Sequence, residues 1–252
     1  MEITGNTILI TGGASGIGLA LAESFYIEKN TVIIVGRNDQ KLAEAKIKYP
    51  GLNTIQADIT NEQDRQHLLN ETREHFPQLN MLVNNAGAAF LNDLRTDPDF
   101  YQKTYQEIET NFLAPVRLTQ LFLETLQKHP SAAVINITTI GVFLPLTVMP
   151  GYSASKAALS SFTRSLRFQL ENTPVKVFEV LPPPVDTALV SMFHMHKISP
   201  EKLAEKVMHG LKKDRYEMSI GIAKVLRWMG RLAPHTAEAM SHKQSLKTTR
   251  RS

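Results

Sequence analysis

The stretch NTILITGGASGIGLALAESF, residues 6–25, decides the fold. Its first six residues form a β-branched, apolar run typical of a buried strand, and its last ten carry apolar residues at helical spacing. Between them lies the loop TGGASGIG, residues 11–18, with Gly12, Gly16 and Gly18 at the spaced positions. A glycine-rich turn between a strand and a helix lets the backbone approach a pyrophosphate, and the helix N-terminus favours its negative charge. This context predicts a nucleotide site, and the alternative is a tight turn that binds nothing.

The alternation of short apolar runs with helical patterns continues along the chain. Strands are expected at residues 6–11, 31–36, 53–58, 79–87, 131–139, 175–184 and near 216–221. Helices are expected at residues 16–30, 39–50, 61–76, about 98–128, 152–172 and 200–213. Continuous apolar strands that alternate with helices indicate a parallel sheet covered on both faces. The sequence therefore predicts one α/β domain over residues 1–240, a Rossmann-type doubly wound parallel sheet of about seven strands with helices on both faces.

Excess positive charge is concentrated at the end of the chain. The segment SHKQSLKTTRRS, residues 241–252, holds four basic residues and no acidic one, and without those four the chain has 24 basic and 24 acidic residues. A short basic segment is most often solvated, so residues 241–252 are predicted to be a flexible tail. Contact of this tail with nucleic acid or an anionic membrane is the less favoured alternative.

Composition indicates the cellular compartment of the protein and which kinds of site it can form. Apolar residues make up 42% of it, enough for a core, yet no stretch approaches the ~20 uninterrupted apolar residues of a membrane helix. The first residues carry Glu2 and no basic segment, so no secretory signal is expected. The chain has no cysteine, which excludes disulfides and thiolate metal sites, and no cluster has metal-ligand spacing. These features predict a cytoplasmic protein without a metal site.

The segment GYSASKAAL, residues 151–159, places a tyrosine four residues before a lysine. On a helix, positions i and i+4 share one face, so Tyr152 and Lys156 can point into the same space. A free tyrosine has a pKa near 10, which is too high for efficient acid–base work at neutral pH. The nearby Lys156 ammonium is expected to favour the phenolate. The pair is therefore a candidate acid–base centre.

Five motifs in register together resemble the short-chain dehydrogenase/reductase family over roughly residues 5–220. They are TGGASGIG at 11–18, Asp58, NNAG at 84–87, Asn111 and YSASK at 152–156. The resemblance implies a bound nicotinamide dinucleotide and hydride transfer between nicotinamide C4 and a carbonyl or secondary alcohol carbon. It also implies a small-molecule carbonyl or alcohol as the substrate.

The resemblance implies four catalytic residues. Tyr152 would protonate the carbonyl oxygen in reduction or take the hydroxyl proton in oxidation. Lys156 would hold the nicotinamide ribose and pass the proton onward, and Asn111 would anchor a water in this relay. The family places a serine thirteen positions before the tyrosine, where this chain has Thr139, and Thr138 is the alternative if the register differs by one.

The resemblance also implies which residues bind the cofactor. Asp58 would flank the adenine ring, and the NNAG stretch would back the adenosine and stabilise the central sheet. The full expected set is Gly12, Ala14, Ser15, Gly16, Ile17, Gly18, Arg37, Asn38, Asp58, Ile59, Asn85, Ala86, Gly87, Tyr152, Lys156, Val185 and Thr187.

The end of the second strand, VIIVGRN, favours NADP(H) over NAD(H). Enzymes that prefer NAD usually place an acidic residue here, and this chain has Gly36 followed by Arg37. A guanidinium can hold a 2′-phosphate with several donors, and Asn38 can assist. The alternative is that Arg37 is a surface residue that starts a helix.

The expected substrate walls follow the fourth, fifth and sixth strands and are mostly apolar, so an apolar alcohol or ketone is expected. The residues that form these walls are Phe90, Phe143, Leu144, Val148, Met149, Leu189, Met192 and Phe193. His194 and His196 either contact the substrate or are solvated loop residues.

The family commonly shows PGxVxT after the sixth strand, whereas this chain has PPPVDT at 182–187. Pro183 stands where glycine is usual, so the local turn must differ or stiffen.

Surface patterns predict association. Residues 98–128 and 152–172 are apolar on more than one helical face, and the resemblance implies that these helices pair in a homodimer or homotetramer. The basic amphipathic segment 221–234, with Trp228, could dock on its own fold, on a partner subunit or on a membrane. The first two are favoured.

The sequence thus predicts an NADP(H)-dependent oxidoreductase. PPPVDT and the threonine pair also resemble a narrower branch, the DltE-type oxidoreductases. The alternative, motivated by Thr139 and Pro183, is a catalytically weak or inactive dinucleotide-binding sensor or scaffold.

Overall fold

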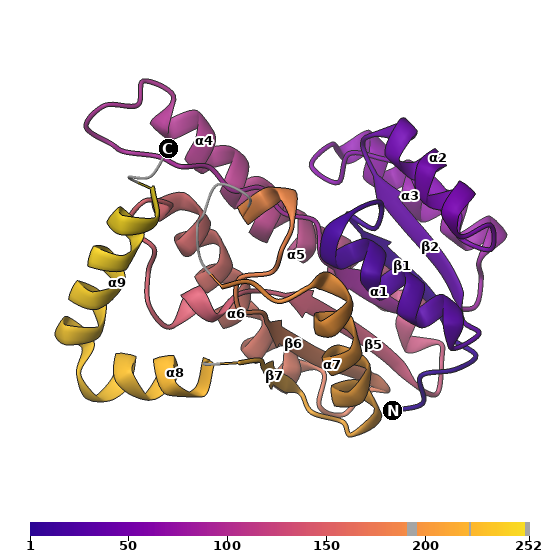
Figure 1. Ribbon diagram of the computed structural model, residues 1–252. Coiled ribbons are helices and arrows are strands. Elements are labelled where there is room, and N and C mark those ends of the chain that lie inside the picture. Colours follow the sequence, from indigo (N-terminus) through magenta and orange to yellow (C-terminus); the bar gives the residue numbers. More distant parts are fainter. Residues whose placement is uncertain (191–195, 222, 250–252) are drawn as a thin grey trace.

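Seven parallel strands form the centre of the protein, in the order β3-β2-β1-β4-β5-β6-β7 (Figure 1). The computed structural model describes residues 1–190, 196–221 and 223–249. The strands are β1 Thr7–Thr11, β2 Thr31–Gly36, β3 Asn53–Gln56, β4 Leu79–Asn84, β5 Ala132–Ile137, β6 Val175–Leu181 and β7 Glu217–Ser219. From β1 the chain builds outward to β3 and then returns to place β4 on the other side of β1. The carboxyl ends of β1 and β4 therefore part at a topological switch point, where doubly wound sheets bind ligands.

Helices cover both faces of the sheet, as predicted. One face carries α1 Gly16–Ile27, α2 Asp39–Lys48 and α7 Pro200–Lys212, and α1 and α7 lie side by side in Figure 1. The other face carries α3 Glu62–His75, α5 Ala114–Gln127 and α6 Pro150–Gln169. Side chains alternate between the two resulting cores because successive residues of a strand point to opposite faces. In β1, Ile8 and Ile10 join the first core and Leu9 joins the second.

The helix predicted at about 98–128 is interrupted. It begins as α4, Phe100–Ile108, passes through a π-helical segment, η1 Glu109–Leu113, and continues as α5. At the end of η1 the Ala114 amide donates to the Glu109 carbonyl, five residues earlier. Pro115 has no amide hydrogen to donate to the Asn111 carbonyl, which removes one α-helical bond at this point. The irregularity lies at a residue predicted to be functional, which is where π-helical turns are frequent.

The C-terminal segment differs from the sequence expectation. Helices α8, Ala223–Leu232, and α9, Pro234–Thr249, extend to one side of the sheet (Figure 1), so residues 241–249 are helical where an unstructured tail was predicted. The Ser241 hydroxyl donates to the Pro145 carbonyl at 3.2 Å, and the His242 imidazole lies 3.0 Å from the Thr147 hydroxyl. These contacts give the helix a tertiary anchor, which charge patterning alone does not reveal.

The Trp228 helix docks on its own fold along one side. Leu226 packs against the small core around Ile140 and Leu181, and Arg227 forms an ion pair with Glu217. The opposite side of α8, including Trp228, is exposed. No helix among the described residues is long and apolar enough to span a membrane.

Candidate functional site

A cleft of about 660 Å³ opens at the carboxyl ends of the strands, at the switch point between β1 and β4. Thirteen of the predicted site residues line it: Gly12, Ser15, Gly16, Ile17, Arg37, Asp58, Ile59, Asn85, Ala86, Gly87, Tyr152, Lys156 and Thr187. The other predicted residues, Ala14, Gly18, Asn38, Asn111, Thr139 and Val185, are not part of its lining. The sheet therefore brings together residues that are spread over more than 170 positions of sequence, roughly two thirds of the chain.

The glycine loop leaves backbone exposed to the cleft. Gly12 and Gly16 have positive φ angles of +63° and +53°, a backbone conformation that residues other than glycine rarely adopt. A Cβ atom at Gly12 would lie 2.9 Å from the Ala86 Cα, so the two cleft walls approach closely here. Helix α1 begins at Gly16 after Ser15, whose side chain makes no capping bond. The first amides of this helix form a cradle suited to a phosphate group.

Gly18 lies directly against the glycine loop. A Cβ atom there would collide with the Gly12 carbonyl oxygen. Gly18 therefore allows α1 to pack against the loop, and it supports the cradle without lining the cleft.

Thr11 and Asn85 brace the two strands that border the cleft. The Thr11 hydroxyl accepts hydrogen bonds from the amides of Asn85 and Ala86, at 3.0 and 3.1 Å. In return the Asn85 side chain donates to the carbonyls of Thr11 and Gly12, at 2.9 and 3.2 Å. Sequence analysis missed Thr11, although its place at the end of the first strand was the signal that could have found it. The brace fixes the separation of the walls.

Arg37 and Asp58 lie together at one end of the cleft, where β2 and β3 end. The Arg37 guanidinium is 3.5 Å from the Asp58 carboxylate, and the Arg37 side chain remains 64% exposed. Burial alone would raise the pKa of Asp58, but hydrogen bonds from the Thr60 amide and hydroxyl, together with the Arg37 charge, hold it below its usual value. Asp58 is therefore ionised at neutral pH and can accept a further hydrogen bond.

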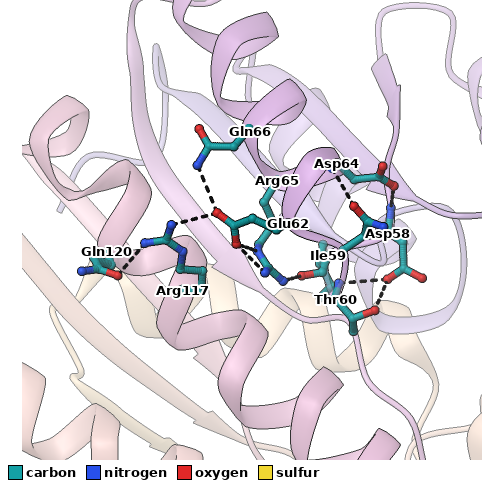
Figure 2. Close-up of polar contacts among 10 residues, drawn as sticks. Asp58, Ile59, Thr60, Glu62, Asp64, Arg65, Gln66, Arg117 and Gln120 are labelled. Atoms are coloured by element: carbon teal, nitrogen blue, oxygen red, sulfur yellow. Dashed lines mark hydrogen bonds and ion pairs between the residues drawn. The ribbon is translucent and has the colours of Figure 1, made fainter.

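The loop that carries Asp58 and Ile59 is held by a charged network (Figure 2). Arg65 donates to the Ile59 carbonyl at 2.6 Å and forms an ion pair with Glu62. Glu62 also pairs with Arg117 of α5, at 2.8 Å. Hydrogen bonds from both arginines lower the pKa of Glu62 to about 2, with Arg117 the larger cause. The network therefore ties the loop at the edge of the cleft to helices α3 and α5.

Two residues predicted to bind the cofactor also make structural contacts. The Asn38 side chain accepts from the Lys41 amide at 2.9 Å and caps α2. Val185 is buried, and its backbone pairs with Ile198 in an isolated bridge after the PPP turn. Thr187 follows and lies close to the glycine loop, because a Cβ at Gly16 would be 3.1 Å from the Thr187 methyl group.

Tyr152 and Lys156 line the inner end of the cleft from α6. Burial raises the pKa of Tyr152 to about 12, the Thr139 hydroxyl lowers it, and the Glu107 charge adds to the rise. The Lys156 Nζ donates to the Ile137 carbonyl at 2.8 Å, and burial lowers the pKa of this amine to about 8. The prediction that the Lys156 ammonium lowers the pKa of the Tyr152 phenol is therefore wrong. Loss of solvation raises the pKa of the phenol and lowers that of the amine, so both side chains are shifted toward their neutral forms.

Asn111 is fully buried in η1 and joins three elements. Its side-chain amide donates to the Ala88 carbonyl at 2.8 Å and to the Ser155 hydroxyl at 2.9 Å, and its oxygen accepts from the Ala88 amide at 2.8 Å. A Cβ atom at Gly87 would be 3.2 Å from this oxygen and 3.7 Å from the Lys156 Nζ. Asn111 therefore lies behind Gly87 and Lys156, which line the cleft.

The two threonines at the end of β5 are distinguished by their partners. The Thr138 hydroxyl is buried within hydrogen-bond distance of Glu179 Oε1, at 2.9 Å, and of the Val180 carbonyl, at 3.1 Å. The Thr139 hydroxyl accepts from the Gly141 amide at 3.2 Å and interacts with Tyr152. Thr139 is thus the hydroxyl beside the phenol.

The predicted substrate walls are only partly within the described residues. Leu144 and Met149 are buried, Phe90, Phe143 and Val148 are partly buried, and His196 is exposed. Met192, Phe193 and His194, and the side chain of Leu189, lie outside the described part of the chain.

Glu107 of α4 is a site residue that sequence analysis missed. Its side chain is fully buried, and its Oε1 accepts from the Phe90 amide at 2.8 Å. Nothing in the sequence distinguishes it from the solvated glutamates of an amphipathic helix, because its burial depends on how α4 packs against α6.

Comparison with known proteins agrees with this geometry. Residues 6–197 match the sequence profile of the family described as short chain dehydrogenase. The uncharacterized oxidoreductase DltE of Bacillus subtilis (strain 168) is 41% identical over 225 residues, which cover 87% of this chain and 89% of that protein. An uncharacterized oxidoreductase of Staphylococcus epidermidis is 30% identical over 210 residues, which cover 81% of this chain and 89% of the relative. The resemblance drawn from the motifs, including the narrower one to DltE-type oxidoreductases, is confirmed.

Solved structures show the same fold. A short chain dehydrogenase from Burkholderia cenocepacia J2315, in complex with NADP, has a TM-score of 0.84 at 24% identity and covers 96% of this chain and 99% of its own. A short chain dehydrogenase/reductase from Burkholderia phymatum, in complex with NAD, has a TM-score of 0.81 at 18% identity, with 97% and 98% covered. From its sequence match and its relatives, the chain belongs to the short-chain dehydrogenase family of oxidoreductases.

Proposed function

We propose that the protein is an NADP(H)-dependent oxidoreductase that interconverts a carbonyl and a secondary alcohol on an apolar substrate. One observation carries the proposal: a single cleft joins a phosphate cradle at Gly12–Gly18 to a tyrosine–lysine pair at its inner end. The cradle suits a dinucleotide pyrophosphate, and the pair suits proton transfer at a reacting oxygen. The nicotinamide, when bound, supplies or accepts the hydride.

The residues present fit a dinucleotide along the whole cleft. The amides of the glycine loop and of the start of α1 would hold the pyrophosphate. Asp58 would accept from the adenine amine, and the Lys156 amine would hold the nicotinamide ribose. Thr187, beside Gly16, would close the cleft over the pyrophosphate.

Preference for the 2′-phosphorylated cofactor rests on the end of β2. Gly36 lines the cleft and has no carboxylate to repel a phosphate, and Arg37 beside it presents an exposed guanidinium. Lys41 also lines this end and adds a second positive charge. A guanidinium binds a phosphate through paired N–H groups. The acidic residue that NAD-dependent enzymes carry at this place would instead repel the phosphate.

Tyr152 would donate its proton to the carbonyl oxygen in reduction and would take the hydroxyl proton in oxidation. With a pKa of about 12 the phenol is protonated at neutral pH, so it is ready to act as an acid. The Thr139 hydroxyl can donate a second hydrogen bond to the same substrate oxygen. Lys156, with a pKa of about 8, is able both to give and to accept a proton near neutral pH and can return one to Tyr152.

Two measurements test the proposal. Thermal unfolding is followed with NADPH and NADH in parallel, since a ligand of the folded state alone raises its stability by RT ln(1 + [L]/Kd). NADPH oxidation is then followed over a panel of apolar ketones and aldehydes, with Tyr152→Phe as the control. We expect a shift at lower concentrations of NADPH than of NADH, and turnover that Tyr152→Phe abolishes. Binding without turnover over the panel would favour the sensor or scaffold instead, and preference for NADH would overturn the cofactor assignment.

A further inference from the structure

Glu107 is a buried carboxyl group behind the proposed reacting centre that the mechanism above does not use. It lies on the inner face of α4, with 0% of its side chain exposed. One oxygen, Oε1, accepts from the Phe90 amide at 2.8 Å, in the segment after β4 that is expected to wall the substrate pocket. A buried acidic residue with one hydrogen bond is costly to keep, so its presence calls for a role.

The second oxygen of Glu107 lies against the residue that precedes Tyr152. A Cβ atom at Gly151 would collide with Glu107 Oε2 and would lie 3.1 Å from the Thr104 hydroxyl. Neither of these two oxygen atoms has a hydrogen-bond partner among the described residues. Because Gly151 has no side chain, the Glu107 carboxyl group can lie against the backbone of the residue before Tyr152.

The charge of Glu107 acts on Tyr152 and raises the pKa of the phenol, in addition to the larger effect of burial. Other charged groups on the packed elements are engaged elsewhere: Lys156 with the Ile137 carbonyl, Lys103 with Asp97 at 2.6 Å, and Arg95 with Asp93 at 2.6 Å. The Nδ1 atom of the His242 ring lies 3.0 Å from the Thr147 hydroxyl. Burial raises the pKa of Glu107 to about 6, and the Phe90 amide lowers it, so the group changes charge just below neutral pH.

We propose that Glu107 is a positioning residue for the reaction: its charge controls how readily Tyr152 gives up its proton, and its hydrogen bond to Phe90 holds the substrate wall. This inference rests on the proposed function for its catalytic meaning. Above pH 6 the negative charge of Glu107 adds to the rise in the pKa of Tyr152 that burial produces, and so further favours the protonated phenol, the form that acts as an acid in carbonyl reduction. Alcohol oxidation, which needs the phenolate, is correspondingly held back until higher pH.

The first test does not depend on turnover. The six tyrosines are labelled with ¹³C at Cζ, and Tyr152→Phe identifies the Tyr152 resonance. We expect the chemical shift of Tyr152 to change with an inflection near pH 6 as Glu107 ionises. The inflection should vanish in Glu107→Gln and persist in Glu109→Gln, a matched change two residues away. No inflection in the native protein, or one that survives in Glu107→Gln, would overturn the proposal.

The second test uses the pH profile of alcohol oxidation. Glu107→Gln removes the charge but keeps an oxygen that accepts from the Phe90 amide, so KM should change less than about twofold while the profile moves to lower pH by roughly half a unit or more. Glu107→Ala should also raise KM, by about fivefold, because the Phe90 amide loses its acceptor. An unchanged profile in Glu107→Gln would contradict the charge effect. Absence of turnover in the native protein would count against the oxidoreductase and leave the resonance test standing.

Discussion

The Arg37 guanidinium and the Asp58 carboxylate face each other at 3.5 Å at one end of the cleft. They come from the ends of neighbouring strands, β2 and β3, and they are 21 residues apart in sequence. Hydrogen bonds from Thr60, together with the Arg37 charge, hold the pKa of Asp58 below its usual value, while most of the guanidinium stays in solvent. One end of the cleft therefore holds both an ionised hydrogen-bond acceptor and an exposed cation.

Replacement of Arg37 by Ala should weaken NADPH binding about 10- to 100-fold and NADH binding by less than about threefold. The reason is that only the phosphorylated cofactor loses a charge-assisted hydrogen bond. Binding constants for both cofactors measure the effect, with Arg73→Ala, an exposed arginine of α3, as the control. An equal loss for both cofactors would mean that Arg37 acts through Asp58 alone.

Replacement of Gly18 by Ala should destabilise the protein by about 2 kcal/mol or more and weaken cofactor binding with it, because the new methyl group would overlap the Gly12 carbonyl. Gly36→Ala is the matched control, since its nearest neighbour would be 3.8 Å away. Urea unfolding of the two variants gives the comparison. Equal stabilities would show that α1 can shift without cost.

Replacement of Thr139 by Ala should lower kcat about 100-fold, as for loss of a donor to a reacting oxygen, and Thr139→Ser should restore most of it. Thr138→Ala should instead destabilise the protein, by about 1–3 kcal/mol, because buried Glu179 loses a partner. Kinetics and urea unfolding of all three variants separate the two effects. Loss of kcat in Thr138→Ala at unchanged stability would reverse the assignment.

The stability of the native protein should fall relative to that of Glu107→Gln as the pH rises from about 4 to 7. The pKa of Glu107 is about 6 in the fold against 4.5 in a free side chain, so the folded state binds the proton more tightly in this range. Deprotonation therefore costs the folded protein stability, by ~2 kcal/mol once both values are passed. Urea unfolding at pH 4 and pH 7 measures the difference. Curves that stay parallel would mean that Glu107 titrates normally.

The strand order and the cleft could be predicted because their signals are local. Apolar periodicity predicted the strands, and the glycine spacing between the first strand and helix predicted the cradle. What sequence analysis missed depends on packing between distant elements. Glu107 is buried only because α6 covers α4, and the pKa of Tyr152 rises because of the same burial.

Some predicted residues make contacts that their motif does not reveal. Gly18 packs closely against the Gly12 carbonyl, and the Asn38 side chain caps α2. A motif gives the residue type and its spacing, whereas the choice between ligand and backbone depends on which atoms lie nearest in the folded chain.

The anchoring of α9 means that the end of the chain is not a dispensable appendage. Ser241 and His242 are attached to Pro145 and Thr147, only a few residues before the α6 segment that carries Tyr152. Trimming the chain after Met240 would leave this apolar wall untied on its outer side. We therefore expect a shortened protein to differ in which substrates it accepts before it differs in how it holds a dinucleotide, because the contacts of Ser241 and His242 go to the segment before α6 rather than to the glycine loop.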